Sequence, residues 1–161
     1  MKQATLCFLL DGNRVLLGMK KRGLGAGRWN GIGGGVEPGE SVLDAARREV
    51  QEEIGVRADN IEKVGMLRFY FPDEPQFAGW NQEVHVYLAR EWVGEPGESD
   101  EMAPQWHAIE EIPFDNMWAD DAHWLPRILA GERLFGEFHF SDGNTVAEFL
   151  LRNLIETGEE A

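Results

Sequence analysis

One amphipathic helix pattern in the first half of the chain constrains the fold more than any other feature. Ser41, with an acidic residue three positions later, is typical of a helix start, and Gly55 is typical of a helix end. Between them, apolar residues recur at helical spacing and form one stripe: Leu43, Ala46, Val50 and Ile54. The pattern predicts a helix over residues 42–54 whose apolar stripe faces a core.

Short apolar runs predict strands in most of the remaining chain. Two of them, residues 5–10 and 15–18, flank Asp11-Gly12-Asn13, which is typical of a hairpin turn. Further strands are expected at residues 64–71, 84–89, 138–140 and 145–151, the last of which is also compatible with a helix. A second, shorter helix is predicted over residues 120–130. Because strands outnumber helices, the predicted fold class is α+β, a mixed sheet with helices packed on it.

Length and cysteine content limit the organisation of the chain. Its 161 residues are close to the typical length of one domain, so we expect one domain over residues 1–156 and a frayed tail at residues 157–161. No apolar run approaches the ~20 residues of a membrane-spanning helix, and residues 1–10 lack the features of a signal peptide. Cys7 is the only cysteine, so no internal disulfide can form. These observations predict a cytoplasmic protein.

The charge balance limits the partners. The chain has 15 Lys and Arg residues and 29 Asp and Glu residues, which gives a net charge of −14. Such a charge repels nucleic-acid polymers and anionic membranes, so neither is expected as a partner. A small anionic substrate remains compatible with it, provided that basic side chains or bound metal ions offset the repulsion locally.

The predicted first helix carries three acidic side chains beside its apolar stripe. Glu49, Glu52 and Glu53 are spaced i, i+3, i+4, and like charges at that spacing destabilise a helix by roughly 0.2–0.5 kcal/mol per pair. A solvated acidic face is the ordinary interpretation of such a pattern. The alternative is a metal site, because Mg²⁺ prefers carboxylate oxygens together with substrate phosphates.

Neighbouring residues favour the metal site. Arg48 lies next to Glu49 and four residues before Glu52, so it is placed to orient a carboxylate. The run Gly33-Gly34-Gly35 allows the backbone to approach an ion or a phosphate closely. Glu40 is spaced to reach back onto the start of the helix.

Gly34, Glu40 and the segment from Arg48 to Val56 have the residue types and the spacing of the Nudix box without a departure. Seven specified residue types at fixed spacing would arise by chance in about one in a million chains of this length. The chain therefore resembles the Nudix hydrolases. That resemblance implies an α/β/α sandwich with a mixed central sheet, and cleavage of a nucleoside diphosphate linked to another group with Mg²⁺, or Mn²⁺ as a substitute.

The resemblance also implies roles for individual residues. Metal ligands are implied at Gly33, through its carbonyl, and at Glu49, Glu52, Glu53 and Glu101. Glu53 or Glu52 would also position or deprotonate the attacking water. Arg48 and Glu40 would orient these carboxylates.

Three further segments narrow the expected substrate. Residues 20–31 (KKRGLGAGRWNG), 98–102 (ESDEM) and 117–121 (MWADD) look like the matching segments of the mammalian-type MutT homologues, which are oxidised purine nucleoside triphosphatases. The similarity implies a monomer that converts a modified purine nucleotide, such as 8-oxo-dGTP, to its monophosphate and pyrophosphate. The alternatives are a Nudix hydrolase with another nucleotide substrate, or a Nudix-fold nucleotide sensor without catalysis.

The same similarity implies a base pocket. Asn30, Asp120 and Asp121 would hydrogen-bond the base, and Trp118 would stack on it. The remaining implied pocket residues are Thr5, Lys20, Ile32, Gly33, Gly34, Gly35, Phe69, Phe71, Met102, Ala119 and Trp124. Two adjacent carboxyl groups in apolar surroundings disfavour double ionisation, so the pKa of one should rise and the pair could both donate and accept. From the spacing alone, the two aspartates could instead cap the second helix.

Three departures from the family pattern bear on specificity. Leu24 stands where the family usually has an aromatic residue, and Gly35 replaces a basic residue. The loop at residues 72–82 looks about four residues longer than in the mammalian proteins. We expect this loop to bring Phe77 and Trp80 to the rim of the pocket.

Overall fold

The structure is a computed structural model and describes residues 1–154. Within this range the strands are β1 (Lys2–Asp11), β2 (Arg14–Lys20), β3 (Trp29–Asn30), β4 (Ile61–Tyr70), β5 (Gln82–Ala89), β6 (Met102–Ala108), β7 (Leu134–Phe140) and β8 (Val146–Asn153). The α-helices are α1 (Val42–Ile54) and α2 (Asp121–Leu129), and short 3-10 turns are η1 (Pro75–Phe77), η2 (Ile109–Glu111) and η3 (Phe114–Asn116). The predicted domain end at residue 156 and the predicted tail at 157–161 lie outside the described residues.

The strands form a mixed sheet in the order β3-β2-β1-β5-β4-β7-β8, and β6 pairs with β2. β1 is parallel to β5 and β4 is parallel to β7, whereas the other neighbours are antiparallel. β1 and β2 pair only beside their turn. Nearer the N-terminal end of β1, residues 32–35 take the place of β2, with antiparallel bridges between Ala4 and Gly35 and between Cys7 and Ile32. We call residues 32–35 the Gly-rich segment.

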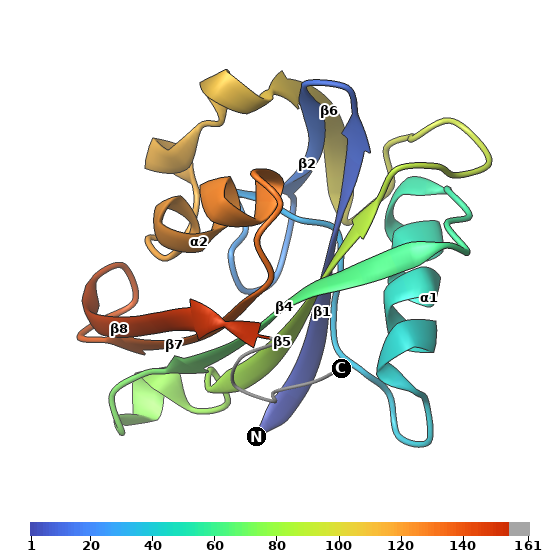
Figure 1. Ribbon diagram of the computed structural model, residues 1–161. Coiled ribbons are helices and arrows are strands. Elements are labelled where there is room, and N and C mark those ends of the chain that lie inside the picture. Colours follow the sequence, from blue (N-terminus) through green and yellow to red (C-terminus); the bar gives the residue numbers. More distant parts are fainter. Residues whose placement is uncertain (155–161) are drawn as a thin grey trace.

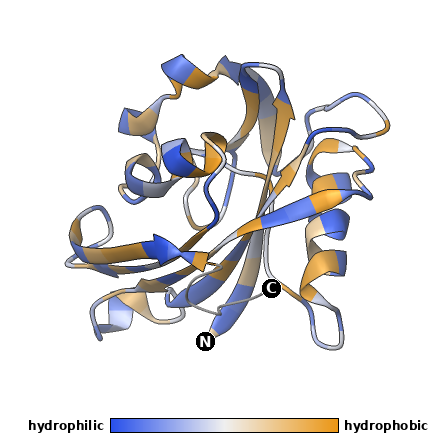
Figure 2. Ribbon diagram, in the orientation of Figure 1, coloured by the Kyte–Doolittle hydropathy of each residue, from blue (hydrophilic) through white to orange (hydrophobic). Residues whose placement is uncertain are grey.

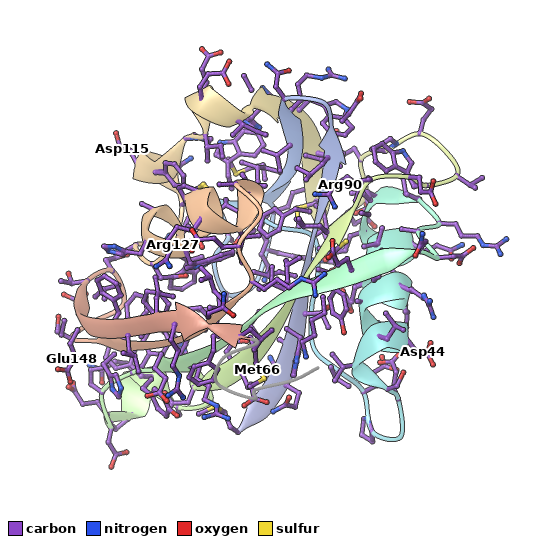
Figure 3. All side chains as sticks on the ribbon, viewed as in Figure 1. Asp44, Met66, Arg90, Asp115, Arg127 and Glu148 are labelled. Atoms are coloured by element: carbon purple, nitrogen blue, oxygen red, sulfur yellow. The ribbon has the colours of Figure 1, made fainter. Side chains whose placement is uncertain are left out.

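The two helices cover opposite faces of the sheet (Figure 1). Side chains of β1 alternate between two cores: Phe8 packs with Trp124 on the α2 side, and Leu9 packs with Val50 on the α1 side. Hydrophobic and hydrophilic residues alternate along both helices (Figure 2), and side chains fill the space between each helix and the sheet (Figure 3). The predicted α/β/α sandwich with a mixed central sheet is confirmed.

The first helix has the predicted bounds and the predicted ends. The Ser41 hydroxyl accepts the N–H of Asp44 at 3.1 Å, and Gly55 ends the helix in the left-handed conformation, at φ 71°. Ala46, Val50 and Ile54 are buried, and Leu43 is half-buried at the edge of the same core. Capping and apolar spacing, which are both local signals, therefore placed this element correctly.

Removal of the cap at Ser41 should destabilise the protein modestly. We expect Ser41→Ala to lower the free energy of unfolding by about 1 kcal/mol, because the N–H of Asp44 loses its acceptor. Ser41→Asp, which keeps an acceptor at the cap, should retain most of the stability. Urea unfolding of the three proteins measures the difference, and equal midpoints would show that the cap contributes nothing.

Several predicted elements need correction. β6 was not predicted. It contains Pro104, which is atypical of a strand interior, and it tolerates the proline since β2 is its one partner in the sheet. β4 begins at Ile61, three residues earlier than predicted, and ends at Tyr70, which leaves Phe71 outside the strand. The segment at residues 145–151, expected as a strand but also compatible with a helix, forms the strand β8. Within residues 1–154, no helix is long and apolar enough to cross a membrane.

Candidate active site

Arg48 is the centre of a polar cluster on the glutamate face of α1. Its Nε and Nη2 donate to the two carboxylate oxygens of Glu40, at 2.7 and 3.0 Å. Its Nη1 donates to Glu49 at 2.8 Å and to Glu52 at 3.0 Å, and its Nη2 also donates to the carbonyl of Gly35 at 3.0 Å. The paired hydrogen bonds from Arg48 hold the pKa of Glu40 below its ordinary value. One guanidinium thus orients three carboxylates and ties α1 to the Gly-rich segment.

Glu53 is the buried member of the glutamate set, with 4% of its surface exposed. Its Oε1 accepts the N–H of Gly33 at 3.2 Å. Burial, followed by the charges of Glu49 and Glu101, raises the pKa of Glu53 to about 8. Burial also raises the pKa of Glu49, in spite of its hydrogen bond with Arg48. Without a cation, the protein therefore disfavours the ionised form of both carboxyl groups.

This donor set fits a hard divalent cation, since it consists of carboxylate oxygens whose repulsion a cation would relieve. Among residues 1–154, however, no three His, Cys, Asp or Glu side chains are already grouped around a common ion position. Arg48 holds Glu49 and Glu52, and the Glu52 side chain is 58% exposed. Glu101 is also exposed and lies 3.4 Å from Arg22, although its charge reaches both Glu49 and Glu53.

Glycine is required where the Gly-rich segment passes β1 and α1. A Cβ on Gly33 would lie 1.8 Å from the carbonyl oxygen of Thr5, and a Cβ on Gly34 would lie 2.5 Å from the Glu49 carboxylate. The N–H of Thr5 also donates to the Gly34 carbonyl at 2.9 Å. The backbone can therefore lie against both the strand and the glutamates only because these positions have no side chain.

A pocket opens beside this segment, at the edge where β1 and β5 start and β4 and β7 end. Its wall contains most of the predicted substrate-binding residues: Thr5, Lys20, Asn30, Gly33, Gly34, Gly35, Phe69, Phe71, Met102, Trp118, Asp120 and Asp121. The pocket is also lined by Gln82, Val84 and Phe140, which were not predicted from the sequence. The two-residue alternation of β5 and β7 was the available signal, because it places these side chains on the α2 face.

Three predicted pocket residues lie outside this wall. Ile32 is fully buried in the core on the α1 side, and Ala119 lines a second cavity with Arg28 and Asn144. Trp124 is 0% exposed, because it fills the core between α2 and the sheet. Its indole Nε1 donates to Asp120 Oδ2 at 2.7 Å, so Trp124 supports the pocket from behind.

Asp120 and Asp121 are both buried, at 3% and 7% exposure, and both line the pocket. Burial raises the pKa of each. The pKa of Asp121 lies well above its ordinary value, because burial and then the charge of Asp120 oppose its ionisation. A side-chain hydrogen bond joins the two groups, and Trp124 donates to Asp120. Of the two groups, Asp121 therefore holds a proton more readily, and in that form it can donate a hydrogen bond. The alternative capping role is not observed for Asp120, whose side chain makes no capping hydrogen bond to α2.

Aromatic rings complete the wall next to the aspartates. The guanidinium of Arg28 lies 4.2 Å from the centre of the Trp118 ring. The rings of Phe71 and Phe140 stack with their centres 4.6 Å apart, and both meet the Trp118 ring at steep angles. The expected approach of the longer loop is confirmed, because Trp80 contacts both Phe71 and Trp118.

Comparisons with known proteins agree with this geometry. The NUDIX domain model matches residues 1–128. The chain is 47% identical over 150 residues to an oxidized purine nucleoside triphosphate hydrolase of Danio rerio, and 45% identical to that of Mus musculus, in each case over 93% of this chain and 94% of the relative. The crystal structure of a MutT mutator protein from Bacillus halodurans superposes with a TM-score of 0.79 at 27% identity, over 94% of this chain and 97% of that one. The chain therefore belongs to the Nudix hydrolase family.

Proposed function

We propose that this chain hydrolyses oxidised purine nucleoside triphosphates, such as 8-oxo-dGTP, to the monophosphate and pyrophosphate. One observation carries the proposal: a single pocket wall contains both the Gly-rich segment, against which Glu49 and Glu53 lie, and the buried pair Asp120 and Asp121. A nucleoside triphosphate has the two matching parts, a polyphosphate and a base. The relatives from Danio rerio and Mus musculus, which are hydrolases of this class, support the same substrate.

Nudix hydrolases generally use divalent cations, and we propose Mg²⁺ here, with Mn²⁺ as a substitute. The residues that would hold it are Glu49, Glu52 and Glu53, with Glu101 and the Gly33 carbonyl as further ligands. When bound, Mg²⁺ would neutralise phosphate charge and promote the ionisation of water. A chain with a net charge of −14 needs such local neutralisation before it can bind a polyanion.

The chain's own residues would position the reacting groups. Arg48 and Glu40 would orient Glu49 and Glu52, as their hydrogen bonds already do. Glu53 or Glu52 would accept the proton of the attacking water. Because burial raises the pKa of Glu53 to about 8, this carboxyl holds a proton at neutral pH in the cation-free protein. A nearby cation favours the ionised form, which can accept a proton.

We propose that the buried aspartate pair recognises the base. Asp120 would accept a hydrogen bond from the base, and the protonated Asp121 would donate one. Nδ2 of Asn30 donates to the Arg28 carbonyl at 2.9 Å, which leaves Oδ1 as a further acceptor. Trp118 would stack on the base, and the rest of the wall would be supplied by Thr5, Lys20, Phe69, Phe71 and Met102.

Loss of the acceptor at Asp120 should change base selectivity. We expect Asp120→Asn to alter the ranking of modified purines by about tenfold in kcat/KM, because a hydrogen bond to a charged group is worth roughly 1.5–3 kcal/mol. The Mg²⁺ concentration for half-maximal rate should stay unchanged, since Asp120 is not among the proposed ligands. An unaltered ranking would argue against base recognition by this residue.

The raised pKa of Asp121 also predicts a pH dependence. Asp121 keeps its proton below the raised pKa and loses it as the pH rises, which places two charges in one buried site. Affinity for a base that needs a donor at this point should therefore fall as the pH rises through the raised pKa of Asp121. Asp121→Asn, which donates at every pH, should flatten the accompanying rise in KM, measured over the pH range in which both proteins stay folded. A rise in KM of equal size in the variant would assign the effect to another group.

A substrate panel tests the function itself. We expect kcat/KM for 8-oxo-dGTP to exceed that for unmodified dGTP, with release of pyrophosphate and not of phosphate. The panel should also contain 2-hydroxy-dATP, O6-methyl-dGTP and N6-methyl-dATP, because the pair could serve each of these purines. A preference for dinucleotides or ADP-sugars would indicate another Nudix substrate, and tight binding without turnover in Mg²⁺ would indicate a sensor.

We also propose that the chain is one catalytic domain that acts as a monomer in the cytoplasm on free nucleotides, with no membrane or nucleic-acid polymer as partner. The net charge of −14 and the single buried cysteine support this proposal. Sedimentation at working concentration would measure the oligomeric state, and a dimer would contradict it.

A further inference from the structure

We propose that Trp80, in the loop between β4 and β5, is a positioning residue that sets the affinity of the pocket for the base by holding Trp118 and Phe71 in place. We call residues 72–81 the rim loop. The inference rests on the proposed function, because it concerns how the same pocket binds its base.

Trp80 packs behind two rings of the pocket wall. Its ring centre lies 5.1 Å from that of Phe71 at 80°, and 6.2 Å from that of Trp118 at 89°. Phe77, from the same loop, meets Trp80 at 5.0 Å and 79°. These are edge-to-face contacts, the arrangement that aromatic pairs prefer. Phe77 and Trp80 are half-buried, although most of their neighbours in the rim loop are exposed.

The rim loop is itself held in place, so it can serve as a support. Asn81 Oδ1 accepts the N–H of Phe71 at 2.7 Å, and the N–H of Trp80 donates to the Phe77 carbonyl at 3.1 Å. The turn between β7 and β8 packs against the loop, since a Cβ on Gly143 would lie 3.4 Å from the Trp80 ring. Gly79 of the loop is part of the pocket wall.

Other groups hold Trp118 from different directions. The Arg28 guanidinium lies 4.2 Å from its ring centre, and Gly25 passes so near that a Cβ there would lie 3.0 Å from Nε1. Trp80 supplies one of three steeply angled ring contacts to Trp118, together with Phe71 and Phe140. Without it the Trp118 indole would gain rotational freedom, which base binding would then have to remove. The free-energy cost of ordering one such side chain when the base binds would weaken Kd by about three- to tenfold.

Trp80→Ala tests the inference. We expect KM for 8-oxo-dGTP, and Kd for 8-oxo-dGMP measured by calorimetry, to rise about three- to tenfold, with kcat within about twofold of wild type. Trp80→Phe, which keeps an edge-to-face ring, should restore most of the affinity. Pyrophosphate affinity should not change, because Trp80 acts on the base and not on the phosphates.

Trp92→Ala is the matched control. Trp92 is also half-buried and stacks on Trp106 at 5.8 Å, but it packs on the α1 side of the sheet. Its loss removes an indole and an aromatic pair without touching the pocket wall, so it should leave KM for 8-oxo-dGTP unchanged. A rise in KM equal to that of Trp80→Ala would show that the effect is general destabilisation, and would overturn the inference.

A double-mutant cycle tests whether Trp80 acts through its neighbour. In a Trp118→Ala background, Trp80→Ala should have less than half of its effect on log KM. The same effect in both backgrounds, or an unchanged KM in the single variant, would overturn the inference. If Trp80→Ala fails to fold, Phe77→Ala and Trp80→Phe test the same support with smaller losses. A wild-type protein that does not hydrolyse 8-oxo-dGTP would contradict the proposed function instead.

Discussion

Glu53→Gln is expected to lower kcat by about 10²–10⁴-fold, the range for loss of a positioned acid–base group. Glutamine keeps the shape of the side chain and can still accept the N–H of Gly33, but it brings no negative charge to a cation and cannot accept the proton of water. Steady-state rates with 8-oxo-dGTP in Mg²⁺ measure the change. Glu110→Gln, at an exposed position in η2, is the matched control and should retain the wild-type rate.

The loss of activity in Glu53→Gln should not come from unfolding. Folding raises the pKa of Glu53 from 4.5 to about 8, so the folded state disfavours the carboxylate. In the absence of metal, the stability of the wild-type protein should therefore fall as the pH rises from about 4.5 to about 8. The variant lacks this ionisation and should show a shallower decline in Tm over that interval. Turnover near the wild-type level in the folded variant would reject Glu53 as a catalytic residue.

Gly33→Ala is the second change for which we expect a large effect. The added Cβ would lie 1.8 Å from the Thr5 carbonyl oxygen, and a backbone atom cannot move away as the end of a flexible side chain can. The Gly-rich segment must then separate from β1, and the N–H of Gly33 must leave Glu53. We expect kcat/KM to fall by at least about 100-fold, since misplacement of reacting groups by about 1 Å can cost that much. We also expect the free energy of unfolding to fall by about 1–3 kcal/mol.

Gly35→Ala is the control for this prediction, because it adds the same methyl group two residues away. The nearest atom to a Cβ on Gly35 is Lys2 Cε at 3.6 Å, an ordinary contact with a flexible side chain. The urea midpoint of this variant should match that of wild type. Equal destabilisation by the two substitutions would show that the segment responds to any added side chain and not to the approach of Thr5.

Local signals in the sequence were sufficient for α1 and the side chains that it carries. Its caps at Ser41 and Gly55 are short-range interactions, and helical spacing alone places Arg48 beside Glu52. The glutamates of α1, the arginine that binds them and the neighbouring glycines could therefore be named in advance. The strands were predicted less accurately. β6, which contains Pro104, was not predicted, and the start of β7 was predicted four residues late.

The burial of Glu53 was not predicted. The apolar stripe placed Val50 and Ile54 in the core, but their neighbour at position 53 is acidic and was expected only on the face beside that stripe. It is buried because the Gly-rich segment crosses over it, and that contact joins residues 20 positions apart. Trp124 differs in the opposite direction: similarity assigned it to the pocket wall, and it lies wholly in the core.

The sequence alone identified the Nudix box of this protein, because helical spacing places Arg48, Glu49, Glu52 and Glu53 together on α1, and Gly34 and Glu40 lie in the segment just before that helix. Only the tertiary structure decided the surroundings of those residues. The pairing of β1 with the Gly-rich segment buries Glu53, and the packing of α2 on the sheet buries Asp120 and Asp121 and gives them unequal pKa values. The physical reason is that spacing fixes which side chains share a face, whereas burial and electrostatics depend on contacts between segments that are distant in the chain.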